Sequence, residues 1–205
     1  MAKKKVFIAV TAYDSRLFVV TMMSILNNID NLKTKVYDIQ LHAKMGDCYI
    51  DNVRNDIANT FLKSDCTDLI FVDSDIQFDF NAMGKLLDMP VQVIGGAYPY
   101  RSQDMNGFPV KIKVDENGIP VGNVNLKILE CDFIPTGLMR IRRDAFEKII
   151  ASNPEDKTDR GIYQFFKTGR LFKDEGDHQW YGEDVYFCKV CARNGIIIWC
   201  NPDIG

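Results

Sequence analysis

Residues 69 to 75 read Leu-Ile-Phe-Val-Asp-Ser-Asp, four apolar residues followed at once by a pair of acids. The apolar run does not alternate, which predicts a strand buried on both faces of an α/β sheet. An open α/β sheet binds ligands at the carboxyl ends of its strands, where Asp73, Ser74 and Asp75 are therefore expected. Two carboxylates so close together repel each other unless a divalent cation lies between them, and Mg²⁺ or Mn²⁺ prefers oxygen ligands. A solvated turn is the alternative, and the buried strand before the acids favours a metal site.

Strands and helices alternate in the first half of the chain. The expected strands there are Val6 to Thr11, Val36 to His42, Leu69 to Val72 and Val91 to Ile94, and the expected helices are Ser15 to Asn28, Tyr49 to Leu62 and Phe80 to Leu87. In the first helix, Ser15 is the expected N-cap, and apolar residues three or four apart predict one buried stripe. That stripe consists of Phe18, Met22, Ile25 and Ile29.

Extended segments dominate after residue 110. Asn117-Gly118 lies between Val110 to Val114 and Ile119 to Val121 and predicts a hairpin turn. The other expected elements are extended runs at Leu126 to Phe133, Leu138 to Ile141 and Ile196 to Cys200, and helices at Arg143 to Ala151 and from Glu183 to Asn194. This order predicts a single α/β domain over residues 1–205, with an open, mixed, mainly parallel sheet and helices on both faces.

The bulk composition excludes some classes of function. A formal charge of -3 and a pI near 5.4 provide no broad basic surface, so nucleic-acid binding is not expected. Lys3 to Lys5 and the apolar run after them mimic a signal peptide, but polar residues follow from Thr11, which predicts a cytoplasmic protein, or one of the host cytoplasm if the chain is viral. No apolar run reaches the roughly 18 residues of a transmembrane helix.

The six cysteines allow two interpretations. Cys188 and Cys191 form a CxxC that Cys200 and His178 could complete as a zinc site. The CxxC falls in an expected helix, however, where this spacing simply places two small apolar residues on one face. Buried free thiols are therefore the favoured interpretation.

Two acids open the last expected helix in the segment Trp180-Tyr181-Gly182-Glu183-Asp184. Carboxylates are common at helix N-termini because they interact favourably with the macrodipole, so capping is one interpretation. The other is a general base beside an aromatic wall for a sugar ring. In either case the helix dipole is expected to keep the pKa of Asp184 low.

Three further segments have side chains suited to a phosphorylated sugar. Gly95 and Gly96 at a strand end would let the backbone approach a ligand, and the following Tyr98 and Arg101 would offer a ring and a phosphate-binding fork; a plain turn is the alternative. Arg54 lies early in a helix, where an exposed face is the simpler interpretation. Pro135-Thr136-Gly137 predicts a substrate-lining loop or a bulge.

Taken together, these features resemble the GT-A glycosyltransferases, especially the small family-2-like and virus- or phage-encoded enzymes. The matching segments span nearly the whole chain in family order: VFIAVTAYDS, RNDIANTFL, LIFVDSDIQF, VIGGAYPYR, IPTGLMRIRRDAFEKI and GEDVYFCKVCARNGIIIWCNPDIG. The resemblance implies a nucleoside-diphosphate sugar as donor, a glycan, lipid or protein as acceptor, and Mn²⁺ or Mg²⁺ held on the diphosphate by Asp73 and Asp75. It also implies an inverting enzyme with Asp184 as the base and Glu183 as an acceptor-site ligand.

The resemblance and the segments above together predict two further groups of site residues. For the donor they are Thr11, Ala12, Tyr13, Asp14, Arg54, Ser74, Gly96 and Arg101, and for the acceptor or sugar pocket they are Tyr98, Thr136, Gly137, Trp180 and Tyr181. Relatives often supply another metal ligand, commonly a histidine, after the last Asn-Pro-Asp-like segment. This chain ends at Gly205 before such a residue, as a fragment would, and His178 is the candidate substitute.

Other functions remain open at this point. A HAD-type phosphatase carries its Asp-x-Asp on the first strand, whereas two strand-helix units precede Asp73 here. A nucleotidyltransferase would have a glycine-rich basic loop after the first strand, and Thr11 to Asp14 lack it. A non-catalytic nucleotide-sugar or glycan-binding module and a retaining glycosyltransferase of the same fold are the alternatives kept.

Overall fold

The computed structural model of the chain describes residues 4–35, 37–99, 107–170 and 179–204. The strands are β1 (Lys4–Ala12), β2 (Tyr37–Met45), β3 (Asp68–Asp73), β4 (Val93–Gly96), β5 (Lys111–Ile112), β6 (Gly122–Asn123), β7 (Ile128–Phe133), β8 (Leu138–Arg142), β9 (Gly169–Arg170), β10 (Trp180–Tyr181) and β11 (Ile198–Asn201). The helices are α1 (Val19–Thr34), α2 (Ile50–Lys63), α3 (Ala82–Asp88), α4 (Arg143–Ser152) and α5 (Glu183–Arg193). The elements expected in the first half of the chain are all present, with shifted ends.

In the described ranges, one sheet of nine strands has the order β2-β1-β3-β8-β4-β11-β7-β5, with β6 paired to β7. β1 is parallel to β2 and β3, and β11 is parallel to β4. β8 is antiparallel to both of its neighbours, β3 and β4, which therefore run in the same direction. The sheet is thus mixed and mainly parallel, as the sequence predicted.

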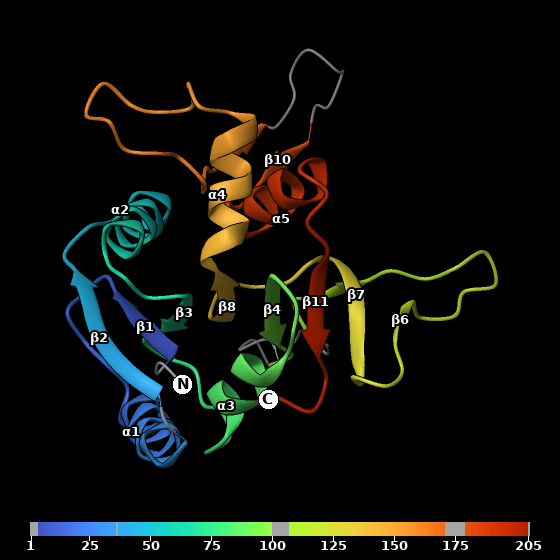
Figure 1. The fold of residues 1–205 in the computed structure, drawn as a ribbon, viewed down its shortest axis with the longest axis horizontal. Helices are drawn as coiled ribbons and strands as arrows, with labels where there is room; N and C mark the ends of the chain where they lie inside the picture. Colours follow the sequence, from blue (N-terminus) through green and yellow to red (C-terminus); the bar gives the residue numbers. More distant parts are fainter. Residues whose placement is uncertain (1–3, 36, 100–106, 171–178, 205) are drawn as a thin grey trace.

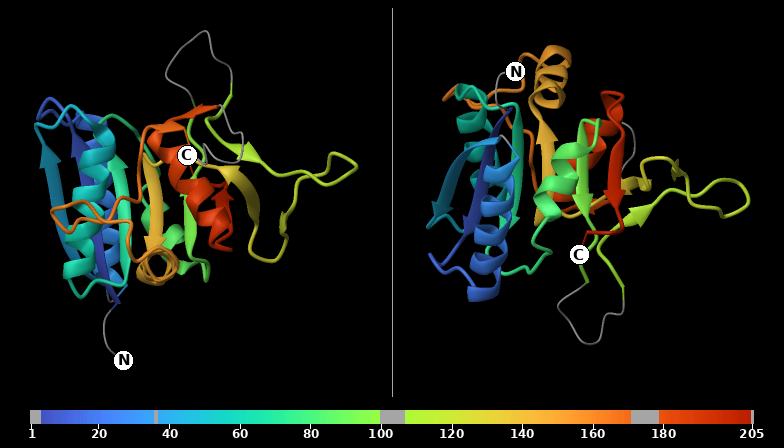
Figure 2. Two further views of the ribbon diagram at one scale, coloured as in Figure 1. Left: turned by 90° about the horizontal axis from the view of Figure 1, so that it is seen from above. Right: turned by 60° about the horizontal axis from the view of Figure 1, so that its bottom comes forward.

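Helices cover both faces of this sheet. Figures 1 and 2 show α1 and α3 on one side and α2, α4 and α5 on the other, and an apolar cluster fills each interface. The segment around the Asn117-Gly118 turn projects away from the sheet in each view. No helix in the described ranges is long and apolar enough to cross a membrane.

The predicted hairpin exists, but in a reduced form. Gly118 adopts a positive φ of 78°, and Val114 forms an antiparallel bridge with Pro120. The ladder does not extend along the predicted runs, because β5 and β6 each pair mainly with β7.

The predictions for α1 were wrong at its start and in half of its buried face, since Ile25 and Ile29 do pack against the core. Ser15 has a φ of 61° in a turn and does not cap the helix, which begins after Phe18. Phe18 and Met22 are exposed, and the buried positions are Thr21, Ser24, Ile25, Asn28 and Leu32. Polar side chains therefore make up much of the docking face of this helix.

Asn28 explains why a polar face can be buried. Its Nδ2 donates to the carbonyl oxygens of Ser24 and Asp79, and its Oδ1 accepts a hydrogen bond from the Met83 amide. The Phe78 amide donates to Ser24 Oγ nearby. Helix α1 thus fixes the loop that follows the Asp-x-Asp segment, because its side chains satisfy the loop's backbone groups.

We predict that Asn28→Ala lowers the free energy of unfolding by about 3 kcal/mol, because it leaves buried groups of Asp79 and Met83 without partners. Asn27→Ala is the matched control, since Asn27 is exposed one position earlier in the same helix. Urea unfolding of both variants measures the difference, and equal midpoints would show that the Asn28 bonds do not hold the loop.

Candidate active site

Asp73 is the last residue of β3, and two donors fix its carboxylate. Thr11 Oγ1 donates to Asp73 Oδ1 at 2.7 Å, and Arg54 Nη2 donates to the same oxygen at 3.1 Å. Thr11 lies opposite Asp73 in the register of β1 and β3. The described part of the chain places no hydrogen-bond donor on Oδ2. Asp73 therefore has one carboxylate oxygen committed to the protein and one available for a ligand.

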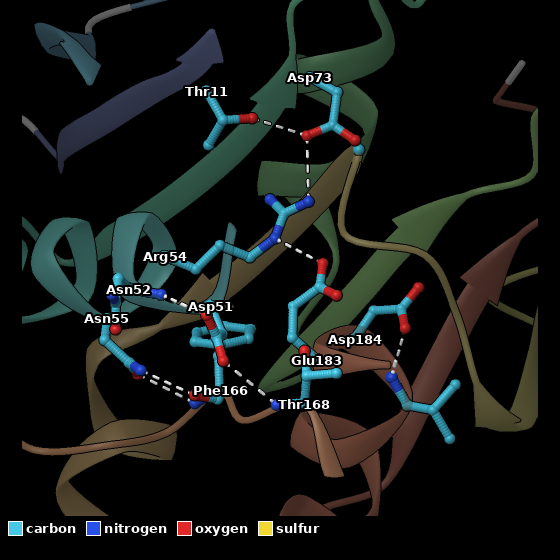
Figure 3. A network of polar contacts seen from close by, with 12 residues as sticks. Thr11, Asp51, Asn52, Arg54, Asn55, Asp73, Phe166, Thr168, Glu183 and Asp184 are labelled. Carbon is cyan, nitrogen blue, oxygen red and sulfur yellow. Dashed lines mark hydrogen bonds and ion pairs between the residues drawn. The ribbon is translucent and has the colours of Figure 1, made fainter. Parts of the chain in front are cut away.

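Arg54 lies in α2 and is only 3% exposed, so it is not part of a solvated helix face. Its Nε donates to Glu183 Oε1 at 3.1 Å, while Nη2 holds Asp73 (Figure 3). Its guanidinium also lies over the ring of Phe71, 5.5 Å from the centroid. Burial acts to lower the pKa of Arg54, but Asp73 and Glu183 outweigh it and the pKa is raised. A permanent cation thus joins two carboxylates.

Glu183 and Asp184 form the first turn of α5. Asp184 Oδ1 accepts a hydrogen bond from the Val185 amide at 2.7 Å. Burial, and then the charge of Glu183, raise the pKa of Asp184, and the backbone bond and Arg54 only partly oppose them. The low pKa expected from the helix dipole is wrong in direction, because burial outweighs the backbone donors.

Two clefts meet at this group, with volumes of about 470 Å³ and about 320 Å³. Both are lined by Arg54, Asp73, Asp75 and Glu183. The larger cleft is also lined by Ile76, Gln77, Tyr98, Pro99, Pro109, Pro135, Thr136 and Asp184. The smaller is also lined by Thr11, Ala12, Tyr13, Asp47, Cys48, Ile50, Val53 and Ser74. The first-strand loop and Asp184 therefore lie in different clefts that share the Asp-x-Asp.

Tyr98 and Gly137 are close-packed beside Asp73. The Gly137 amide donates to Tyr98 Oη at 3.0 Å, and burial followed by the charge of Asp73 raises the pKa of Tyr98. A Cβ on Gly137 would lie 2.2 Å from Tyr98 Oη and 3.0 Å from Asp73 Oδ2. Only glycine fits here without displacing one of these side chains.

Several predicted site residues lie outside both clefts. Asp14 is exposed and accepts a hydrogen bond from the Arg16 amide, and Gly96 packs against Ile204. Trp180 is exposed on β10, and Tyr181 is buried beside it. Arg101 and His178 fall outside the described residues.

Some cleft residues were not predicted, notably Asp47, Cys48 and Gln77. Asp47 and Cys48 follow the carboxyl end of β2, and Gln77 follows that of β3. The rule that ligands bind at carboxyl ends of strands, applied to the second strand as well as the third, would have indicated the first two.

The burial and the pKa values of the cysteine thiols do not favour zinc binding. Cys48 is exposed and the other five are buried. Burial raises the pKa of the Cys188 thiol to about 12 and that of Cys191 well above its ordinary value, which disfavours the thiolates that zinc needs.

The clefts are strongly acidic. Asp47, Asp73, Asp75, Glu183 and Asp184 line them, and Arg54 is the single basic residue among the described residues of their linings. Within the described ranges no group of three or more His, Cys, Asp or Glu residues is arranged to hold a metal ion. Asp73 and Asp75 can supply part of a coordination shell, and their hard oxygens suit Mg²⁺ or Mn²⁺ when substrate phosphates complete it.

No protein-family model and no curated protein sequence matches the chain. Among solved structures it is similar to residues 1–349 of TarS from S. aureus, with 12% identity and a TM-score of 0.50, over 97% of this chain and 58% of that one. It is also similar to a glycosyltransferase involved in the glycosylation of the major capsid of PBCV-1, with 10% identity and a TM-score of 0.35, over 73% of this chain and 67% of that one. The second agreement is too loose to carry an argument.

The second of these proteins is described as a glycosyltransferase. With the sheet described above, the likeness to TarS establishes that this chain has a mixed, mainly parallel α/β fold in common with that protein. At 12% identity it establishes the fold alone, and the chain spans less than two thirds of the matched TarS chain. The finer resemblance, to family-2-like and viral or phage enzymes, remains a prediction.

We predict that Gly137→Ala destabilises the protein by about 1–3 kcal/mol, because the added methyl overlaps Tyr98 Oη. The same substitution in a Tyr98→Phe background should cost less, since the hydroxyl is gone. Unfolding midpoints of the two single variants and the double variant decide it. An equal cost of Gly137→Ala in both backgrounds would contradict the proposed contact.

Proposed function

We propose that the chain is a metal-dependent glycosyltransferase that moves a sugar from a nucleoside-diphosphate sugar to an acceptor hydroxyl with inversion, using Asp184 as the base. One observation carries the proposal: the two clefts share Asp73 and Asp75, and only the larger contains Asp184. A donor diphosphate at the shared carboxylates would have its nucleoside near Thr11 to Tyr13 and its sugar near Asp184. The acceptor, a glycan, lipid or protein, would then enter the larger cleft.

Asp73 and Asp75 are the residues that would hold Mn²⁺ or Mg²⁺. Asp73 has Oδ2 available, and a magnesium-type site commonly uses only one or two carboxylates together with substrate phosphates. The bound cation would neutralise charge on the departing diphosphate. Asp73 and Asp75 would thus bind and orient the donor.

Asp184 would take the proton of the acceptor hydroxyl. The hydroxyl oxygen then bonds to the anomeric carbon, the bond from that carbon to the diphosphate oxygen breaks, and the nucleoside diphosphate leaves with the electron pair. A single displacement of this kind inverts the anomeric centre. The partly buried position of Asp184 suits a base, because partial exclusion of water raises its proton affinity.

The first experiment is a thermal-shift screen of nucleotide sugars and nucleoside diphosphates, with and without Mn²⁺. A ligand that binds only the folded protein raises its melting temperature. Release of free nucleoside diphosphate in the presence of an acceptor panel then separates an enzyme from a binding module. Binding with no release under any condition would favour the module.

Asp75→Asn should weaken Mn²⁺-dependent binding of the nucleoside diphosphate by about tenfold or more, because one of two carboxylate ligands is lost. Asp79→Asn is the matched control, since this half-exposed acid lies four residues later and near Lys85. Calorimetry measures both. Equal affinities for the two variants would remove Asp75 from the metal site.

Asp184→Asn should lower turnover by about a hundredfold with little change in donor affinity, as expected for loss of a general base. Because the pKa of Asp184 is raised, wild-type kcat/KM should fall as the pH drops through a value above the ordinary aspartate value of about 4, and the variant should lack this limb. Proton NMR of the product gives the anomeric outcome. A retained configuration would contradict the single displacement.

A further inference from the structure

Among the described residues, the side chains of Arg54 and Arg140 are buried and that of Arg143 is partly buried. The hydrogen bonds of Arg140 and Arg143 go to backbone carbonyl oxygens, and Arg140 Nε also lies 3.7 Å from Asp68 Oδ1. Arg140 donates to carbonyls of Leu86, Met89, Val91 and Gln92, and Arg143 donates to those of Phe61, Leu62, Ser64 and Cys66. Every guanidinium nitrogen of both has a partner. Arg140 thus binds the end of α3 and the segment after it, and Arg143 does the same for α2; neither lines the clefts.

In the part of the chain that the structure describes, Arg54 differs from Arg140 and Arg143 in its hydrogen-bond partners, in its unpaired nitrogen and in its position at the clefts. Its two hydrogen bonds go to carboxylates, Asp73 and Glu183, and both of these line the clefts. Its third nitrogen, Nη1, is buried and has no hydrogen-bond partner among the described residues. A buried nitrogen without a partner costs stability. The contacts of Arg54 therefore stabilise the fold less than those of a guanidinium with all its nitrogens hydrogen-bonded.

The two carboxylates belong to parts of the chain that are far apart. Asp73 ends β3 in the first half of the sequence, and Glu183 opens α5 at a separation of 129 residues from Arg54. Asn55, the next residue of α2, binds the same distant region: its side chain bonds the backbone of Phe165 and Phe166. The ring of Phe166 in turn stacks on Phe187 of α5, with centroids 4.6 Å apart.

We propose that Arg54 is a positioning residue: it fixes the first turn of α5, and with it Asp184, relative to Asp73. This inference rests on the proposed function. Buried ion pairs often add little net stability, but they can select one arrangement of the chain. A planar guanidinium can hold two carboxylates at once in a fixed geometry, whereas a lysine is a point charge on a flexible stem. Displacement of a reacting group by about 1 Å can cost on the order of a hundredfold in rate.

The test is Arg54→Lys, which keeps the charge but cannot hold both carboxylates in the same plane. We expect kcat to fall by about tenfold to a hundredfold, while the affinity for nucleoside diphosphate with Mn²⁺ changes by less than about threefold. Arg143→Lys is the matched control: it should lower the melting temperature and leave kcat and KM unchanged. A normal kcat in Arg54→Lys would overturn the proposal. So would a loss of donor affinity alone, which would make Arg54 a donor ligand.

A second measurement covers the case in which Arg54→Lys does not fold. Glu183→Met breaks the same contact from the other side, and it should lower kcat with donor affinity retained; normal turnover would again overturn the proposal. The ion pair between Arg54 and Glu183 can be tested without any activity assay. Melting temperatures of Arg54→Met, Glu183→Met and the double variant should show a smaller loss for the double than the sum of the single losses. Additive losses would contradict the contact, whereas absence of transfer by the wild-type protein would contradict only the proposed function.

Discussion

A guanidinium removed from water needs acceptors for its N–H groups, and at Arg54 two carboxylates meet this requirement at the centre of the site. Asp73 and Glu183 meet that need from β3 and α5, each at 3.1 Å. Three segments that are remote in sequence are thereby held at one point. The acidic edge of the sheet follows from the same arrangement, because the cation partly offsets carboxylates that would otherwise repel one another.

The antiparallel strand β8 determines what else reaches that edge. It lies between β3 and β4, so the loop before it arrives where those two strands end. The Asp73 amide donates to the Gly137 carbonyl at 2.9 Å, which joins this loop to the Asp-x-Asp. A purely parallel sheet would have placed the start of β8 at the opposite edge. The reversal of β8 thus brings Thr136 and Gly137 next to the acids, whereas Tyr98 arrives there just after the carboxyl end of β4.

Local patterns were sufficient to predict the framework. The unbroken apolar run of β3 predicted both its burial and the position of Asp73 and Asp75, because strand ends and crevices are linked by the topology of the sheet. The buried face of α1 could not be predicted this way, since Asn28 is buried by hydrogen bonds to a loop more than fifty residues away. The burial of Arg54 and the raised pKa of Asp184 likewise depend on contacts between distant segments. Hydrophobic periodicity and helix dipoles contain no information about such contacts.

The distribution of thiols gives the molecule an unusual chemical asymmetry. Five cysteines are enclosed in the core, and Cys48 alone is exposed, in the lining of the smaller cleft. A mild alkylating or fluorescent reagent would therefore label Cys48 selectively, without any substitution in the chain. Thr11 and Arg54 line the same cleft, so a dye attached to Cys48 would report on its occupancy.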